Sequence, residues 1–515
     1  MIRLATQFLL SFLGFRGASL ILLQNNNELR ATGGFITSVL ELSRFKIKQR
    51  SVFGELDQHP KLQGPKPLME MLKDGHFKSW TFRDANYFPD FGESSGQLIH
   101  FYKQVFPNTK VSALLAINFS FIENVHRVLG TLKLKGRRLA SHELFYFLTA
   151  EVSDIDRHSR EALASRKGVL VSLAKKILLA SLLRFWTWPA LLVLVRRSFK
   201  NRDLQFYDAN FKRTFTYDKG QDFLAIIESN FLGLKSNRYL QRSVVHETRA
   251  SMKGEFQNDL RIVWEHLGSL NRPLSGKYQA YIRIYLPAMI EELRHFSSHP
   301  LGAASVYREG MFQVFGFKLF LQPGEKFLLN LSYRLQKKTL EKYSFKYFKQ
   351  SGVQRESLQK SAIYPKSYAL LPDLFGRVSE NVYTYSVAQV EEDICLNLQA
   401  DKARRSPRIL KHEIISPTTI LLRFSEPVQL KKNLQKQFIL KQKGKGDSYP
   451  IKKARLLEEA CAIHLTVDDL PKVEEEFYEL TLKDVLSEEG TAVQPNPRTV
   501  TVVYRSKHFT KMHEQ

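Results

Sequence analysis

Apolar and polar residues alternate one by one through most of the chain after residue 236, and this periodicity constrains the fold more than any other feature. The clearest example is "VFGFKLFLQPGEKFLLNLSYRLQ", in which Pro323 and Gly324 separate two alternating runs. Alternation with a period of two is typical of strands that bury one face, and Pro-Gly is a favoured turn pair. The pattern therefore predicts a β-sandwich over residues 236–398.

A short basic segment, "DKARRSPR" at residues 401–408, precedes a second alternating region. This region covers residues 405–506 and predicts another all-β sandwich. Residues 507–515 follow it as an expected frayed tail.

The first 235 residues have a different texture, in which short apolar runs alternate with stretches of helical periodicity. Strands that alternate with helices are typical of an α/β layer fold. We therefore expect an α/β N-terminal layer domain over residues 1–235, which includes the apolar run "QDFLAIIESN" at 221–230 as a buried strand. Its other expected strands are Ser19–Leu23, Phe35–Leu42 and Val111–Ile117.

Charge and cysteine content limit the possible partners and sites. The formal net charge of +26 is expected to attract polyanions such as acidic wall polymers, lipid head groups or nucleic acid, although a basic proteome would explain it equally well. Nucleic acid is the least favoured of these, because the basic runs contain few aromatic residues for base stacking. Two cysteines exclude a disulfide-dense scaffold and a four-cysteine metal site.

Two further apolar segments bear on targeting. The first 23 residues form a poor signal-peptide candidate, because Arg16 interrupts the apolar run. The segment "ILLASLLRFWTWPALLVLV" at 177–195 approaches membrane-spanning length, but it contains Arg184 and Pro189. A charge at the centre of a spanning helix costs about 2.5–3.5 kcal/mol. We therefore expect a buried or membrane-surface helix pair that breaks at Pro189.

A polar stretch between two apolar runs near the N-terminus is the main candidate site. An arginine offers fork geometry for phosphate or carboxylate, and a Gly-Gly pair permits a backbone nest for an anion. The alternative is an ordered turn in which Glu28 and Arg30 pair inside the domain. The ligand-binding candidates of this stretch are Asn26, Glu28, Arg30, Thr32, Gly33 and Gly34.

The same stretch, "LLQNNNELRATGGFI", resembles the signature of the bacterial family called domain of unknown function 4012. Three later segments are similar to that family in the same order: "FRDANYFPDFGES", "VSALLAINFSFIENVHRVLGTLKLKG" and "DFLAIIESNFLGLKSNRYLQRSV". The resemblance covers most of residues 15–365 and departs where Ser112-Ala113-Leu114 replaces a usual Asp-Gly-Val. The family's preceding membrane helix has no evident counterpart, so no anchor is identified.

The C-terminal region is similar to bacterial Ig-like surface modules in "ILLRFSEPVQLKKNLQKQFIL" and "YELTLKDVLSEEGTAVQP". The two resemblances together imply an extracytoplasmic or cell-surface protein with a membrane association. They also imply the fold class, an α/β layer domain followed by two all-β (Ig-like sandwich) domains.

A more distant likeness is to the LytR-CpsA-Psr phosphotransferases, which move wall polymers from a polyprenyl-pyrophosphate carrier to peptidoglycan. On that analogy the Asn, Glu and Arg of the motif contact substrate, and Asp84 and Asp90 hold a divalent cation such as Mg²⁺. Lys235 or Arg238 would neutralise phosphate charge. The arginine-rich pattern of those enzymes is only faintly present in "DIDRHSREALASRK", which counts against activity and leaves no catalytic residue assigned.

Three hypotheses follow. The leading one is an envelope protein whose N-terminal domain binds an anionic wall polymer or lipid head group through the motif. The second is a glycopolymer phosphotransferase, which requires Arg30 to face Asp84 or Asp90 across a cavity. The third is a purely structural or adhesive surface protein, which requires Glu28 and Arg30 to be buried and mutually satisfied.

Overall fold

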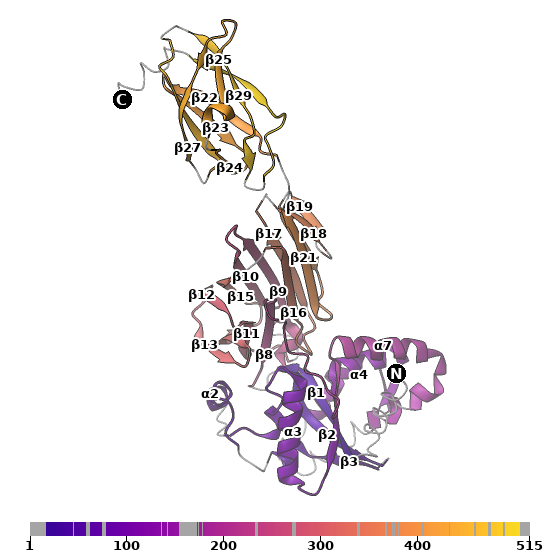
Figure 1. Cartoon of the computed structure of the whole chain (residues 1–515). Helices are drawn as coiled ribbons and strands as arrows, with labels where there is room; N and C mark the ends of the chain where they lie inside the picture. Colours follow the sequence, from indigo (N-terminus) through magenta and orange to yellow (C-terminus); the bar gives the residue numbers. More distant parts are fainter. Residues whose placement is uncertain are drawn as a thin grey trace. The chain divides into compact units, whose positions relative to one another are not determined.

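The chain folds into two compact units, and each is described by itself. The first comprises Met1–Tyr364 and Leu371–Ala400, and the second comprises Pro365–Leu370 and Asp401–Gln515 (Figure 1). The computed structural model describes residues 17–504 except for 45, 58–61, 75–78, 135, 142, 154–171, 174, 178, 232–234, 270–273, 337–339, 366–367, 373, 375, 380, 403–405, 432, 458–459, 472–474 and 488–489. The signal-peptide candidate before residue 17 and the expected tail at 507–515 therefore lie outside the described residues.

The N-terminal part of the first unit is built on a five-stranded sheet of mixed direction. β1 runs antiparallel to β2 and parallel to β4, and its apolar residues Leu20 and Leu22 are fully buried. The three strands expected here are confirmed as parts of β1, β2 and β4. In sheet order the strands are β3 (Lys46–Arg50), β2 (Gly33–Ser43), β1 (Ala18–Arg30), β4 (Val111–Asn118) and β7 (Leu204–Tyr207).

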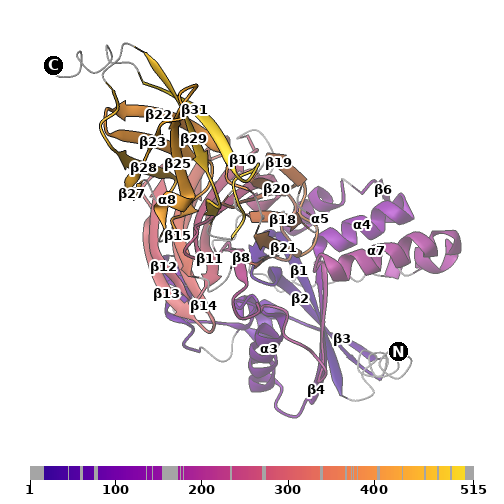
Figure 2. The same cartoon turned by 45° about the horizontal axis from the view of Figure 1, so that its top comes forward.

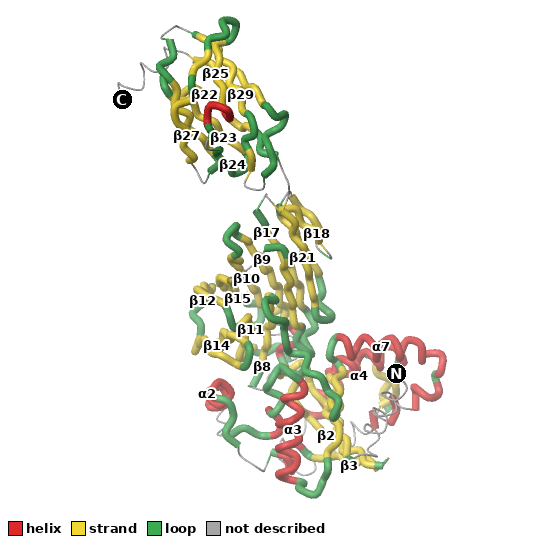
Figure 3. Tube along the Cα trace, in the orientation of Figure 1, coloured by secondary structure: helices red, strands yellow, loops and turns green. Residues whose placement is uncertain are grey.

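Helices accompany this sheet (Figure 3), and a small hairpin belongs to the same part of the chain. The hairpin pairs β5 (Leu132–Leu134) with β6 (Arg137–Leu139). The helical elements are η1 (Val52–Leu56), α2 (Lys66–Asp74), η2 (Phe82–Asp84), α3 (Phe91–Val105), α4 (Phe119–Leu129), α5 (Leu144–Ser153), η3 (Phe185–Thr187), α7 (Trp188–Lys200) and η4 (Ser236–Tyr239).

The polar stretch between the apolar runs is mostly strand. β1 continues through Arg30, and only Ala31 and Thr32 form the turn before β2 begins at Gly33. The strand keeps its pairing by two register shifts, one of which lies between Asn25 and Leu29. Polar composition alone therefore overestimated the length of the loop, because β-bulges let a polar strand continue beside its partner.

The remainder of the first unit is a sandwich of two seven-stranded sheets. In order, the first sheet contains β12 (Ile290–Ser297), β15 (Lys326–Gln336), β10 (Glu255–His266), β9 (Leu240–Ala250), β17 (Glu356–Ile363), β20 (Val382–Val387) and β19 (Gly376–Ser379). The second sheet contains β13 (Gly302–Glu309), β14 (Phe312–Leu321), β11 (Tyr278–Pro287), β8 (Asp222–Ser229), β16 (Lys342–Phe348), β21 (Ile394–Lys402) and β18 (Tyr368–Pro372).

One strand from before the expected domain boundary at residue 235 belongs to the sandwich instead of the α/β layer. β8 was expected in the α/β layer, but it lies in the second sandwich sheet between β11 and β16. Every residue of β8 is buried, so its continuous apolar run predicts a central strand correctly. Such a run carries no information about which sheet it joins. The two regions then form one compact unit rather than two.

The sandwich interior is rich in aromatic side chains and also contains buried charged side chains. Trp264 of β10 packs against Phe317 of β14, with ring centroids 6.0 Å apart, which shows that the two sheets face each other. Between them the fully buried Arg242 is paired with Glu228 at 2.8 Å and also with Glu356. Buried charges of this kind persist only when they are paired and hydrogen-bonded.

Within its described residues, the second unit consists of strands apart from one four-residue helix, Leu434–Gln437. Buried residues of both four-stranded sheets, such as Leu422 and Leu480, share one apolar core, as expected for a sandwich. The chain's two cysteines, Cys395 and Cys461, are free thiols. The elements of this unit are β22 (Ile409–Ser416), β23 (Thr419–Phe424), β24 (Val428–Gln429), α8 (Leu434–Gln437), β25 (Phe438–Gln442), β26 (Ser448–Tyr449), β27 (Ile451–Leu457), β28 (Ala462–Val467), β29 (Glu476–Leu482), β30 (Leu486–Ser487) and β31 (Arg498–Tyr504).

Candidate functional site

Arg30, the strongest anion-binding candidate, lies at the end of β1 with only 2% of its surface exposed. Its Nε donates to Asp84 Oδ1 at 3.0 Å, and its second terminal nitrogen lies 2.9 Å from the same oxygen. The other terminal nitrogen donates to the main-chain carbonyls of Leu29 and Asn230. These acceptors enclose the guanidinium, so its donors are used inside the fold.

Aromatic rings and a second carboxylate complete the surroundings of Arg30. The guanidinium carbon lies 5.2 Å from the ring centre of Phe35 and 4.7 Å from that of Phe231. Glu28 Oε1 lies 3.9 Å from the arginine. Burial raises the pKa of Glu28 above its usual value, although the charges of Arg30 and the half-buried Lys235 oppose this rise. Glu28 and Arg30 are therefore buried together, as the structural hypothesis requires.

Asn26 connects β1 to a distant loop and to a helix. Its Nδ2 donates to the carbonyl of Gly352 at 3.2 Å, and its Oδ1 accepts from the main-chain nitrogen of Ser120 in the first turn of α4 at 3.1 Å. Thr32 is engaged in a similar way, because its carbonyl accepts from Gln205 Nε2 at 2.6 Å. Both residues use their polar groups for internal contacts.

The two motif glycines are required for close packing. Gly33 has a φ of +135°, and a Cβ atom there would lie 2.2 Å from Asn118 Oδ1. A Cβ at Gly34 would lie 2.3 Å from the main chain of Asn25. Neighbouring protein atoms therefore leave no room for a side chain at either glycine.

The motif forms the junction between the α/β layer and the sandwich. Gln350 Nε2 donates to the carbonyls of Arg30, at 3.1 Å, and of Glu228, at 2.7 Å. Asn237 Oδ1 accepts from the main-chain nitrogen of Leu29 at 3.2 Å. We call the motif residues 26–34 with these partners the β1 junction. Sequence reasoning missed Gln350 and Asn237, and the only available signal was the clustering of polar residues just after two apolar strands.

The two aspartates proposed as metal ligands have separate partners. Asp84 binds Arg30, whereas Asp90 caps α3 by accepting from the main-chain nitrogen of Glu93 at 3.1 Å. The other oxygen of Asp90 accepts from the nitrogen of Thr214 at 3.1 Å. Within the described parts of the chain, no cluster of three or more His, Cys, Asp or Glu side chains could hold a metal ion. Asp84 and Asp90 are therefore engaged by separate protein groups and do not fit a shared Mg²⁺ site.

Arg238, the candidate for neutralising phosphate, is held by a carboxylate and an aromatic ring. Its guanidinium lies 3.1 Å from Glu123 Oε1 and 4.6 Å from the ring centre of Phe145. Burial raises the pKa of Glu123, and the charge of Arg238 opposes that rise. The structure therefore brings Glu28, Arg30 and Asp84 together and gives Arg238 a different partner.

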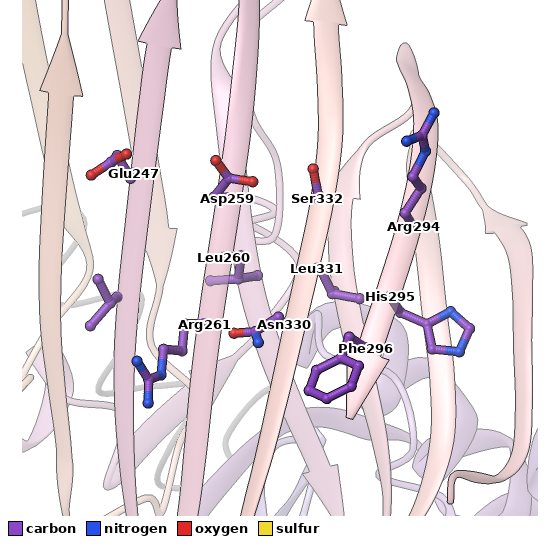
Figure 4. Close-up of a pocket in the computed structure, with 11 residues that line it drawn as sticks. Glu247, Asp259, Leu260, Arg261, Arg294, His295, Phe296, Asn330, Leu331 and Ser332 are labelled. Carbon is purple, nitrogen blue, oxygen red and sulfur yellow. The ribbon is translucent and has the colours of Figure 1, made fainter. Parts of the chain in front are cut away.

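A groove of about 380 Å³ lies away from the motif, on the first sandwich sheet (Figure 4). Its lining residues belong to β9, β10, β15 and β12, which are neighbours in that sheet. Figure 4 draws their side chains. Arg261 and Arg294 contribute positive charge, and Glu247 and Asp259 contribute negative charge. The anion-binding hypothesis expects an open basic groove, and this mixed lining differs from it.

Solved structures give only distant likenesses. The N-terminal part of the bacterial S-layer protein SbsC matches at 20% identity and a TM-score of 0.18, covering 20% of this chain and 24% of that one. A putative nutrient binding protein from Legionella pneumophila matches at 9% identity and a TM-score of 0.25, covering 31% and 67%. An M1 zinc metallopeptidase from Deinococcus radiodurans matches at 12% identity and a TM-score of 0.19, covering 38% and 51%.

No curated protein matches the chain. Residues 18–152 match the model of a family described as "Protein of unknown function (DUF4012)". This span contains the whole of β1 and β2, and with them the motif residues of the β1 junction. The match supports the part of the sequence resemblance that concerns that family.

Proposed function

We propose that this chain is a non-catalytic structural protein of the cell envelope, located outside the cytoplasm, with an Ig-like second unit. The observation that supports this proposal is the enclosure of Arg30 by Asp84, the carbonyl of Asn230 and two aromatic rings. The motif then serves to connect the α/β layer to the sandwich. The surface of the protein, rather than the motif, makes its contacts with other molecules.

The phosphotransferase alternative gains little support from the site. A transferase acting on a pyrophosphate needs positive groups aimed at the developing charge, because they act by stabilising the transition state. Arg30 contacts Asp84 directly, at 3.0 Å, instead of facing it across a cavity as that hypothesis requires. Its guanidinium is 2% exposed, and its donors are bound by protein acceptors. The likeness to LytR-CpsA-Psr enzymes therefore stays a rival without supporting geometry.

An anionic envelope component remains the proposed partner. The formal net charge of +26 favours a contact with acidic wall polymer or anionic lipid head groups through the exposed surface. Such a contact depends on salt concentration, because screening shortens the range of exposed charges.

A transfer assay on the full chain tests the proposal. The protein would be incubated with Mg²⁺, a polyprenyl-pyrophosphate-linked glycan and peptidoglycan, and Asp84→Asn would be assayed beside it. We expect no transfer above the background without protein. Mg²⁺-dependent transfer that Asp84→Asn abolishes without changing the unfolding midpoint would overturn the structural proposal in favour of the enzyme.

A second measurement tests the location. Protease would be added to intact cells of the source organism, and the chain would be followed by immunoblot. We expect cleavage before lysis. Complete protection until lysis would refute the extracytoplasmic location.

A further inference from the structure

Two helical segments after residue 172 form a sharply bent pair. Lys175–Leu183 and Phe185–Lys200 meet at 92°, and together they have the length and apolar composition of a membrane span. No single helix among the described residues has both properties. Figures 1 and 2 show the second segment, α7, lying beside α4 in both views. We call these two segments the bent helix pair.

The inner face of the bent helix pair is packed on α4. Ile177, Leu191 and Leu194 pack against a buried apolar cluster that includes Val125 and Leu129 of α4. Arg184, at the bend, donates to the carbonyl of Leu129. The pair is therefore attached to the α/β layer by an apolar seam and a charged hydrogen bond.

Hydrogen bonds also hold the bend. Trp188 Nε1 donates to the carbonyl of Ser181 at 2.8 Å, which connects the two segments directly.

The break between the segments falls at Arg184 rather than at Pro189, which occupies the first turn of α7. Proline is well tolerated in a first turn, because the N–H groups there have no acceptor within the helix. The prediction of a break at Pro189 was therefore wrong by five residues.

The outer face of the bent helix pair exposes apolar side chains. Trp186 is 66% exposed and Leu192 is 70% exposed, values that are costly in water for large apolar groups. Exposed apolar patches on this scale indicate an interaction surface. The other exposed apolar residues of the pair are Leu179, Leu182, Leu183, Phe185, Trp188, Val193 and Phe199.

The charged residues of the bent helix pair itself are all basic, although Arg197 and Lys200 at its end are paired with Glu391 and Glu392. Residues 172–200 contain no aspartate or glutamate. Lys175 and Arg196 are exposed near the outer ends of the two segments, whereas Arg197 is paired with Glu391 of the sandwich. Cations beside exposed tryptophan and leucine are typical of helices that lie in the interface of an anionic bilayer.

We propose that the bent helix pair is a membrane-surface anchor that inserts its outer apolar face into the interfacial layer of an anionic lipid bilayer. The lipid contact rests on the proposed envelope location and adds to it the site and the partner. The pair lies in the interface rather than crossing it, because its segments are bent at 92° and packed on α4. Tryptophan rings then lie at the head-group level, where one apolar body and one polar N–H are both accommodated.

Intrinsic fluorescence of the full chain provides a direct test. The chain has four tryptophans, of which Trp80 and Trp264 are buried while Trp186 and Trp188 are exposed. Vesicles of phosphatidylcholine with phosphatidylglycerol should shift the emission to shorter wavelength, because only the two exposed rings can become drier. Pure phosphatidylcholine vesicles should give a smaller shift, and added salt should reduce the shift on anionic vesicles.

Matched double variants identify the surface. Trp186→Ser with Leu192→Ser should weaken co-sedimentation with the anionic vesicles by about tenfold or more, because binding scales with buried apolar area. Met289→Ser with Phe296→Ser is the control, since these residues are 76% and 64% exposed on or beside β12 of the same unit. The control should bind as the unchanged protein does.

The outcomes separate the alternatives. Equal binding by both double variants, or no emission shift on any vesicle, would overturn the anchor. An emission shift that instead follows protein concentration without lipid would assign the surface to a second copy of the chain and also overturn it. Transfer activity in the glycopolymer assay would refute the non-catalytic function, whereas lipid binding would stand unaffected.

Discussion

Arg30→Met provides the most direct test of the β1 junction, because it removes one charge and keeps most of the side-chain volume. In the folded protein Arg30 Nε and a terminal nitrogen both contact Asp84 Oδ1, at 3.0 and 2.9 Å. The substitution leaves the buried Asp84 with only the more distant Arg83, whose Nε lies 4.0 Å from the other carboxylate oxygen. It also removes from Glu28 a favourable charge 3.9 Å away.

The expected cost follows from the burial of these groups. Removing one partner of a buried ion pair typically destabilises a protein by about 3–5 kcal/mol. Arg30→Lys keeps the charge but cannot contact both Asp84 and the carbonyl of Asn230, so we expect a smaller loss of about 1–3 kcal/mol. Arg30→Met with Asp84→Asn should cost less than the sum of the single changes, because the unpaired carboxylate is then absent.

Urea unfolding followed by tryptophan fluorescence measures this cost in the relevant unit. All four tryptophans lie in the first unit, so the transition reports that unit alone. A loss below about 1 kcal/mol for Arg30→Met would refute the structural role of the ion pair. Loss of vesicle or polymer binding with an unchanged unfolding midpoint would instead assign the motif to ligand binding.

Three further predictions use the same unfolding assay. Gly352→Ala should destabilise the first unit more than Gly324→Ala. Both positions have positive φ, but a Cβ at Gly352 would lie 2.5 Å from a motif carbonyl, whereas a Cβ at Gly324 would face open space. Equal losses of stability would contradict the close approach at Gly352. Arg242→Met should cost about 3–5 kcal/mol and Arg249→Met about 0–1 kcal/mol, since only the first is a buried pair on β9; similar costs would contradict this. Burial raises the pKa of Asp57 to about 6, so the folded state binds this proton more tightly than the unfolded state does. The free energy of unfolding should therefore fall as pH rises from about 4 to 6. Asp57→Asn should reduce this dependence of stability on pH, and an unchanged dependence would refute the prediction.

Periodicity predicted most of the fold because it is a local property. Strands β1, β2 and β4 could be predicted from residues next to one another in the chain. The placement of β8 could not, because an apolar strand buried on both faces fits the middle of either sheet. The choice depends on pairing with Tyr281 and Phe345, which lie far along the chain.

The candidate site was predicted in composition but not in surroundings. Arginine, glutamate and glycine at one strand end are consistent with an anion site and with a closed junction alike. The partners that distinguish these possibilities are Asn230 and Gly352, and the latter is 326 residues from Asn26. Only the fold brings these groups together, so the residues of the motif alone left both interpretations open.

Two regions of this chain depart from the usual placement of polar and apolar groups: the motif buries charged residues, and the bent helix pair exposes apolar ones. We use this difference to infer where the function lies. The motif's charges are buried and paired, as Arg30 and Asp84 demonstrate, so these groups are already bound by other protein groups. In contrast, Trp186 and Leu192 remain exposed although burial would favour them by a few kcal/mol each. A protein that leaves such surface in water gains most from a partner that removes it. The search for activity should therefore begin at the bent helix pair and the lipid it can contact, rather than at the motif.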